Sequence, residues 1–156
     1  MTIKRLHISG VRNLEKVEID DCGSVNIFTG ANGSGKTSVL ESLFILARAR
    51  SFRSTKLSPV INHLATRCVV FGELLDQSTI GVMRSRNDQQ LFKINGNPVH
   101  TASQLAEQLP LQLINAESFS LLEGGPRVRR QFLDWGGFHV APEFLFHRRR
   151  IQKAIK

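Results

Sequence analysis

The residues of this chain with the clearest chemistry form one short run, Gly30-Ala31-Asn32-Gly33-Ser34-Gly35-Lys36-Thr37. The run fits the pattern G-x-x-x-x-G-K-[ST] of a glycine-rich loop, in which backbone N–H groups surround phosphates. Its glycines permit the backbone conformations that turn several N–H groups toward one anion. Lys36 is placed to reach the β- and γ-phosphates, and the hydroxyl of Thr37 to ligate Mg²⁺. We interpret the run as a P-loop that binds a nucleotide; the alternative is a glycine-rich turn that fits by chance.

Two elements must hold this loop, and the sequence predicts both. Residues 24–29 are apolar and β-prone, as in a short strand. Residues 36–50 place Val39, Leu43 and Ala47 at helical spacing, with no Gly or Pro to interrupt them. A helix that begins at the loop adds its positive N-terminal end to the anion site. The predicted order is therefore strand, phosphate loop, helix.

The rest of the chain alternates between strand and helix patterns. We expect further strands at 2–9, 14–19, 68–75, 79–85, 91–94 and 111–114, with Arg12-Asn13 and Asn95-Gly96 at turns. We expect helices at 101–109, from Pro126 to a stop at Gly136-Gly137, and from Pro142 onward. Because no stop signal precedes Lys156, we expect the chain to end inside a helix and to be part of a longer protein.

Composition indicates a globular domain in a reducing compartment. The 156 residues are 41% hydrophobic and 22% charged, which is ordinary for one domain with one core. No apolar run approaches the ~20 residues of a membrane span, and the N-terminus lacks the long apolar segment of a secretory signal. Cys22 and Cys68 form no C-x-x-C pair. We therefore expect a cytoplasmic protein with free thiols and no membrane contact.

The net charge of +8 gathers in clusters that favour a polyanionic partner. Neutralising DNA phosphates releases counterions, so clustered Arg and Lys residues favour binding to the DNA backbone. Each cluster is alternatively a solvated helix face, or a brace within the fold. The candidate DNA-binding residues are Arg50, Arg53, Lys56, Arg148, Arg149 and Arg150.

Several classes of P-loop protein lack support in the sequence. No N-K-x-D motif is present for reading guanine, as a GTPase requires. Two strands precede the loop, whereas a small-molecule kinase usually places its loop at the first strand. Residues 1–27 contain no Phe, Tyr or Trp to stack on adenine, as an ABC transporter domain usually does.

The chain resembles the RecF family, DNA-repair ATPases with a head like that of SMC and Rad50 proteins. The resemblance covers essentially the whole chain. It is carried by Ile8-Ser9-Gly10-Val11-Arg12-Asn13-Leu14, the loop continued through Ser38-Val39-Leu40-Glu41, Ser51-Phe52-Arg53-Ser54, Ile94-Asn95-Gly96, and Gly124-Gly125-Pro126-Arg127-Val128-Arg129-Arg130-Gln131-Phe132-Leu133-Asp134-Trp135. Val11 and Asn115-Ala116-Glu117 depart from the family, which often has Phe at the first position and a Pro-Glu pair at the second.

The resemblance implies an α/β fold: the N-terminal lobe of an ABC/SMC-type ATPase head, with a mixed sheet and an antiparallel β-subdomain. Residues 1–140 would form this lobe, and 141–156 the start of a helical arm. Arg12 and Asn13 would lie near the ribose or α-phosphate, and Ser38 would extend the phosphate site. Glu117 stands near the position of a Q-loop glutamine, where it either approaches the metal or merely opens a short helix.

The resemblance also implies ATP and Mg²⁺ as ligands. In similar proteins ATP lies between the P-loop of one subunit and the signature motif of another. No Walker B strand and no L-S-G-G-Q signature occur in the 156 residues. This chain would then supply half a site, with little or no turnover alone and weak DNA-stimulated ATP hydrolysis by the full-length dimer.

The implied function is DNA replication and repair. The full-length protein would dimerise on ATP, bind single- and double-stranded DNA at gaps, and work with RecR- and RecO-type partners in recombinase loading and the SOS response. Two alternatives remain: a non-catalytic nucleic-acid-binding module with a vestigial P-loop, and a P-loop phosphotransferase acting on a small substrate.

Overall fold

The computed structural model describes residues 2–56, 58–141 and 143–154. They divide into two compact units, Met1–Leu111 and Gln112–Lys156.

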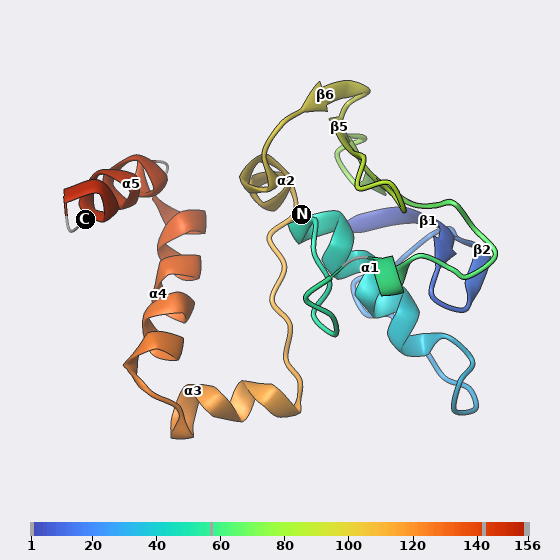
Figure 1. Ribbon diagram of the computed structural model, residues 1–156, viewed down its shortest axis with the longest axis horizontal. Helices are drawn as coiled ribbons and strands as arrows, with labels where there is room; N and C mark the ends of the chain where they lie inside the picture. The colour runs from blue at the N-terminus through green and yellow to red at the C-terminus, as the bar shows by residue number, and fades with distance from the viewer. Residues whose placement is uncertain (1, 57, 142, 155–156) are drawn as a thin grey trace. The chain divides into compact units, whose positions relative to one another are not determined.

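In the described residues of unit 1, six strands form one antiparallel sheet in the order β2-β1-β3-β4-β5-β6 (Figure 1). The strands are β1 Ile3–Val11, β2 Leu14–Ile19, β3 Arg67–Leu74, β4 Thr79–Ser85, β5 Gln90–Ile94 and β6 Asn97–Val99. Five of the seven predicted strands are thus confirmed. The turn between β5 and β6 is made by Asn95 and Gly96, both with positive φ (50° and 78°), as a tight hairpin requires.

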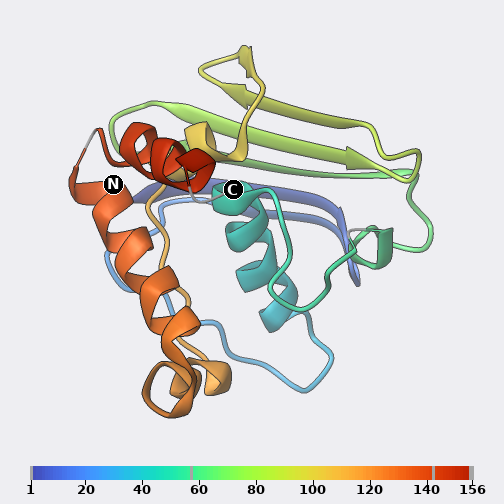
Figure 2. The same cartoon turned by 60° about the vertical axis from the view of Figure 1, so that its left-hand side comes forward.

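Helix α1, Lys36–Arg48, covers one face of this sheet (Figure 2). Alternation along the strands explains the packing: Leu6 and Ile8 of β1 and Val70 of β3 are buried beneath the helix, while the residues between them face away. Leu46 of α1 lies so close to β3 that a Cβ built on Gly72 would approach its Cδ2 to 2.7 Å. Glycine in the strand therefore lets the helix sit close to the sheet. Helix α2, Ala102–Gln108, packs against α1 and β5, and Ser58–Val60 form a 3₁₀ turn, η1.

The expectation of a mixed sheet is wrong for the described residues, where every strand pairing is antiparallel. Residues 24–29 and 111–114 were expected as strands and are neither helix nor strand. A strand needs a partner for its backbone hydrogen bonds, and no described strand pairs with either segment. Val25 and Ile27 are 78% and 82% exposed.

Unit 2 is helical: the 3₁₀ turn η2 Ala116–Phe119, then α3 Ser120–Glu123, α4 Pro126–Val140 and α5 Phe144–Ala154. The predicted stop at Gly136-Gly137 is wrong, because α4 continues through both glycines to Val140. Gly137 has a packing role instead. A Cβ on it would lie 2.6 Å from the ring of Phe144, so glycine admits the ring. Pro142, the predicted start of the last helix, lies outside the described residues.

Candidate nucleotide-binding site

The glycine-rich loop leads directly into α1, as predicted, but residues 24–29 before it form no strand. Gly33 and Gly35 have φ values of 84° and 99°, a backbone region that residues other than glycine rarely occupy. Gly35 is also the N-cap of α1, and a Cβ at this position would meet Leu14 Cδ2 at 2.5 Å. The loop therefore needs glycine at 35 for both its backbone conformation and its close approach to the β1–β2 turn.

Lys36 and Thr37 are the first two residues of α1, at its positive end. The Lys36 Nζ donates hydrogen bonds to the carbonyl oxygens of Gly30 and Ala31, both at 2.7 Å. Thr37 is exposed, so its hydroxyl is open to a ligand. The loop thus presents an ammonium group, a hydroxyl and a helix N-terminus in one place.

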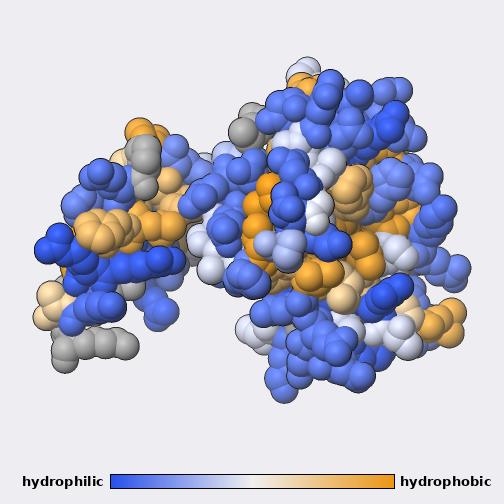
Figure 3. Space-filling view, turned by 90° about the horizontal axis from the view of Figure 1, so that it is seen from above, coloured by the Kyte–Doolittle hydropathy of each residue, from blue (hydrophilic) through white to orange (hydrophobic). Residues whose placement is uncertain are grey.

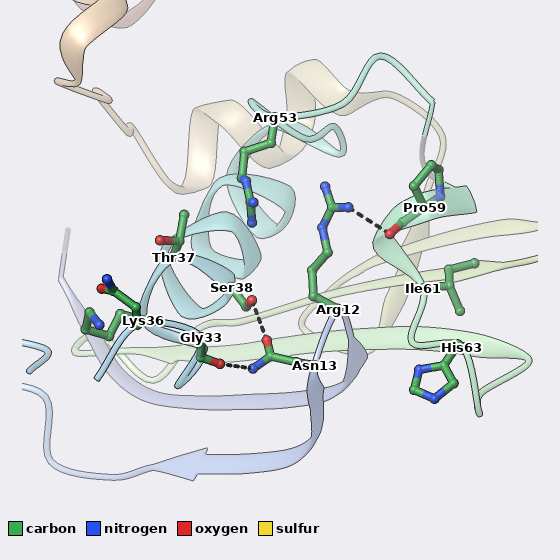
Figure 4. Close-up of a pocket in the computed structure, with 12 residues that line it drawn as sticks. Arg12, Asn13, Gly33, Lys36, Thr37, Ser38, Arg53, Pro59, Ile61 and His63 are labelled. Atoms are coloured by element: carbon green, nitrogen blue, oxygen red, sulfur yellow. Dashed lines mark hydrogen bonds between the residues drawn. The ribbon is translucent and has the colours of Figure 1, made fainter. Parts of the chain in front are cut away.

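An open cavity of about 670 Å³ lies over the loop. Figure 4 shows Arg12 between the Lys36 end of this cavity and the end formed by Pro59 and His63. Three cationic side chains line it, and no described carboxylate does, so its field favours an anion. The lining residues are Arg12, Asn13, Asn32, Gly33, Gly35, Lys36, Thr37, Ser38, Arg53, Pro59, Ile61 and His63.

Asn13, in the β1–β2 turn, holds the loop in place. Its Nδ2 donates to the Gly33 carbonyl oxygen at 2.8 Å, and its Oδ1 accepts from the Ser38 hydroxyl at 2.8 Å (Figure 4). Ser38 is buried, so its side chain supports Asn13 from within α1. Asn13 and Ser38, both predicted as site residues, therefore line the cavity and contact each other, and Asn13 also contacts the loop.

Arg12 lines the same cavity and forms an ion pair with Glu41, a buried residue of α1. Its Nε and Nη2 donate to the two carboxylate oxygens at 3.0 and 2.8 Å, and its Nη1 donates to the Pro59 carbonyl oxygen at 2.8 Å. Burial by itself would raise the pKa of Glu41. Hydrogen bonds from Arg12 and Ser51, with the charges of Arg12 and Arg53, outweigh burial and lower that pKa below its ordinary value of 4.5. The carboxylate is therefore ionised at neutral pH.

The candidate DNA-binding residues fall into two groups. In unit 1, the Arg53 Nη1 lies 3.6 Å from Glu41 and lines the cavity, Arg50 lies over the ring of Phe44, and Lys56 is exposed. In unit 2, the Arg148 Nη2 lies 2.7 Å from Asp134, Arg150 lies over the ring of Phe146, and Arg149 is exposed. The backbone of Glu117 lies in η2, and its side chain is outside the described residues.

Sequence reasoning gave no role to Glu41, Ser51 or Ser54, although all three lie in segments that carried the resemblance. A signal was present for Glu41. It falls on the apolar side of α1, three residues after Ser38 and four before Ile45, where an ionised side chain needs a buried partner. The cavity residues Pro59, Ile61 and His63 carry no comparable pattern.

A family model described as "RecF/RecN/SMC N terminal domain" matches residues 2–127. The chain belongs to this family. It is 52% identical over 160 residues to the DNA replication and repair protein RecF of Pseudomonas entomophila, and 51% identical to that of Pseudomonas putida. These alignments cover 100% of this chain and 44% of each relative, so the chain spans less than half the length of these relatives. It corresponds to the N-terminal part of RecF-family proteins, as predicted.

Solved structures show the same fold. A structure titled as the recombination mediator protein RecF with ATP in the RecFOR pathway has a TM-score of 0.82 and 25% identity, over 97% of this chain and 42% of that chain. A structure from a study of ATP-driven dimerisation and DNA-stimulated activation of SMC ATPases has a TM-score of 0.69 at 18% identity, over 86% and 99% of the two chains. The predicted α/β head of the RecF/SMC type is thus confirmed. In the part of the chain that the structure describes, no helix has the length and apolar character to cross a membrane.

Proposed function

We propose that the cavity over residues 30–37 binds ATP. The observation that carries this proposal is the electropositive cavity built on a P-loop at the start of α1. Gly30 to Gly35 would surround the β- and γ-phosphates with backbone N–H groups, and Lys36 would turn from the loop carbonyls to the phosphates. Arg12 and Asn13 would lie beside the ribose or α-phosphate. The similar structure of RecF with ATP supports this assignment.

Thr37 would supply a hydroxyl ligand to Mg²⁺, which would offset negative charge on the phosphates. The fit is partial. The described residues hold no cluster of three His, Cys, Asp or Glu side chains suited to a metal, but Mg²⁺ commonly takes its other ligands from phosphates and water. The chain's own contribution is then to hold the triphosphate and to orient one hydroxyl toward the metal.

A protein of its relatives' full length, hereafter the full-length protein, would act in DNA replication and repair. We propose that it binds single- and double-stranded DNA at gaps, dimerises on ATP, and cooperates with RecR- and RecO-type partners in recombinase loading and the SOS response, in the cytoplasm. The names of the relatives and the RecFOR pathway of the similar structure support this proposal. The excess of cationic residues supports a DNA partner.

The proposed reaction is slow hydrolysis of ATP by the full-length dimer, stimulated by DNA. This chain would provide the phosphate cradle and not the complete catalytic site, because its sequence carries neither a Walker B strand nor a signature motif. The 156-residue chain by itself should therefore release essentially no phosphate. Steady phosphate release that depends on Lys36 would contradict the half-site proposal.

Calorimetry of ATP binding by the full-length protein tests the site. Lys36→Ala should reduce ATP affinity by at least about tenfold, since a charge-assisted contact to phosphate is lost. Lys93→Ala is the matched control, because Lys93 is an exposed lysine of β5 that does not line the cavity. Equal affinity in all three proteins would remove the P-loop from the proposal.

A salt titration of DNA affinity, with and without ATP, separates the proposed switch from the alternatives. Contacts to DNA phosphates predict a steep decrease of affinity with salt, and a switch predicts that ATP shifts the whole curve. A curve unchanged by ATP and by Lys36→Ala would favour a module with a vestigial P-loop. Transfer of phosphate to a small acceptor would favour the phosphotransferase.

A further inference from the structure

The carboxylate of Glu41 in α1 accepts three hydrogen bonds from other segments. The Glu41 side chain is 0% exposed, and an ionised carboxylate in such a place is stable only when its oxygens accept hydrogen bonds from suitable donors. Here the donors come from two different segments. They are Arg12 in the β1–β2 turn and Ser51 after the end of α1.

The first contact fixes the direction of Arg12. Two guanidinium nitrogens meet two carboxylate oxygens, which is the planar forked arrangement available to arginine and not to lysine. The remaining nitrogen, Nη1, is held by the Pro59 carbonyl oxygen. With both ends fixed, the guanidinium stays at the cavity wall, between the Lys36 end and the Pro59 end (Figure 4).

The second contact folds the segment Ser51–Ser54. The Ser51 hydroxyl donates to Glu41 and accepts from the backbone N–H groups of Arg53 and Ser54 at 2.9 and 3.0 Å. The Ser54 hydroxyl accepts from Arg12 Nη2 at 2.9 Å. The turn that carries Arg53 to the cavity is thus built on the same carboxylate as Arg12.

We infer that Glu41 is a positioning residue of the nucleotide site, which acts on the ligand through Arg12 and anchors Ser51–Ser54 with the same carboxylate. The inference rests on the proposed binding of ATP. Two arginines share one carboxylate, so the group keeps a net positive charge facing the cavity. A triphosphate that contacts Arg12 and Arg53 would meet two guanidinium groups already held by one carboxylate, so the turn at Ser51–Ser54 would respond to the nucleotide.

A double-mutant cycle on ATP affinity in the full-length protein tests the inference. Arg12→Met should weaken ATP binding by about tenfold, the loss expected for one charge-assisted hydrogen bond. Glu41→Gln should have nearly the same effect, and the double variant should lose no more than Arg12→Met alone, because Glu41 acts through Arg12. Losses that add up in the double variant would overturn the inference.

Controls separate this result from a loss of fold or of the site itself. Glu73→Gln removes a carboxylate of β3 that pairs with Lys4 and Arg5 away from the cavity, and it should leave ATP affinity unchanged. If Glu41→Gln does not fold, Glu41→Asp keeps the charge and shortens its reach. Its loss of affinity should then vanish in the Arg12→Met background, and a loss that persists there would overturn the inference. Failure of the unmodified protein to bind ATP would overturn the proposed function together with this inference, whereas additive losses would overturn the inference alone.

Hydrogen exchange gives a second readout. The amides of Arg53 and Ser54, which donate to Ser51, should exchange at a different rate when ATP is added. They should exchange faster in Glu41→Gln with or without ATP. Exchange at these amides that is unchanged by ATP and by the substitution would remove Ser51–Ser54 from the inference.

Discussion

The two units of this chain differ in what their side chains bury. Unit 1 has a continuous core between α1 and the sheet, including Leu6, Ile45, Leu46, Val70 and Leu105. In unit 2, none of the described side chains is buried. Its helices leave large apolar residues exposed, and Figure 3 shows apolar and strongly polar side chains together on its surface. Those exposed residues include Phe132, Leu133, Phe146 and Ile151.

The difference indicates how each unit is stabilised. Burial of apolar surface is the main favourable contribution to folding, and unit 1 obtains it from its own residues. Unit 2 has amphipathic helices without a core of its own, so we expect its stability to depend on residues outside the unit. Its relatives are more than twice as long as the aligned region.

Separate expression of the two units should give the largest effect. Residues 1–111 should unfold in one cooperative transition, because the described core and cavity lie within them. Residues 112–156 should show weak helix signal and no transition, since isolated helices of this length are marginal in water. Circular dichroism during heating measures both. A cooperative transition of residues 112–156 would contradict the comparison.

Removing the buried charge pair should give the next largest effect. Glu41→Gln should destabilise unit 1 by about 3–5 kcal/mol, because it leaves Arg12 without its buried partner. The pKa of Glu41 is lowered in the fold. Ionised Glu41 therefore contributes its full stability above its ordinary value of 4.5, and that contribution is lost as pH falls through the lowered pKa.

Urea unfolding of the 1–111 fragment between pH 7 and pH 3 measures this effect. The unmodified fragment should lose stability below about pH 4.5, and Glu41→Gln should lose less over the same interval. Glu73→Gln again serves as a control, since this carboxylate lies in a partly exposed ion pair. Equal pH dependence of the unmodified fragment and Glu41→Gln would show that Glu41 has no lowered pKa.

Removing one apolar side chain from each unit compares their cores directly. Leu46→Ala in α1 should cost about 2–5 kcal/mol, the usual range for a buried leucine. Leu133→Ala in α4, where the side chain is 71% exposed, should change the same unfolding transition by less than about 0.5 kcal/mol. Chemical denaturation of the 156-residue chain measures both variants. A large effect of Leu133→Ala would reveal a core in unit 2.

Leu46 also offers a sharper test of packing in unit 1. Gly72→Ala should destabilise the sheet by about 1–3 kcal/mol, because the added methyl meets Leu46. With Leu46→Ala also present, the methyl has room, so the double variant should lose less than the sum of the single losses.

Local patterns were sufficient to predict most of unit 1. Alternation identified β1 and β2, and the positive φ at Asn95 and Gly96 agrees with the predicted hairpin. The two wrong strand predictions share one physical cause. Residues 24–29 and 111–114 have strand-like sequences, but a strand also depends on a neighbour, which sequence periodicity does not report. In α4 the glycine stop was wrong because Gly137 accommodates Phe144.

The candidate site divides in the same way. The loop itself and its helix were predictable because each residue type there follows from a local requirement, either for a backbone conformation or for a charge. The Glu41 hydrogen bonds join α1 to segments that are 29 and 10 residues away in sequence. Contacts at such separations depend on the fold, so their partners could be identified only from the structure.

The smallest expected effects compare one polar contact in each unit. Thr101 and Gln104 form a capping box at the start of α2 in unit 1, and Thr101→Ala should cost about 1 kcal/mol. Asp134 pairs with Arg148 in unit 2, where both side chains are more than one-third exposed. Asp134→Asn should change the unfolding transition by less than about 0.5 kcal/mol, because exposed ion pairs are screened by solvent. Thermal unfolding of the 156-residue chain measures both variants, and a loss for Asp134→Asn that exceeds the loss for Thr101→Ala would show that unit 2 takes part in the cooperative fold.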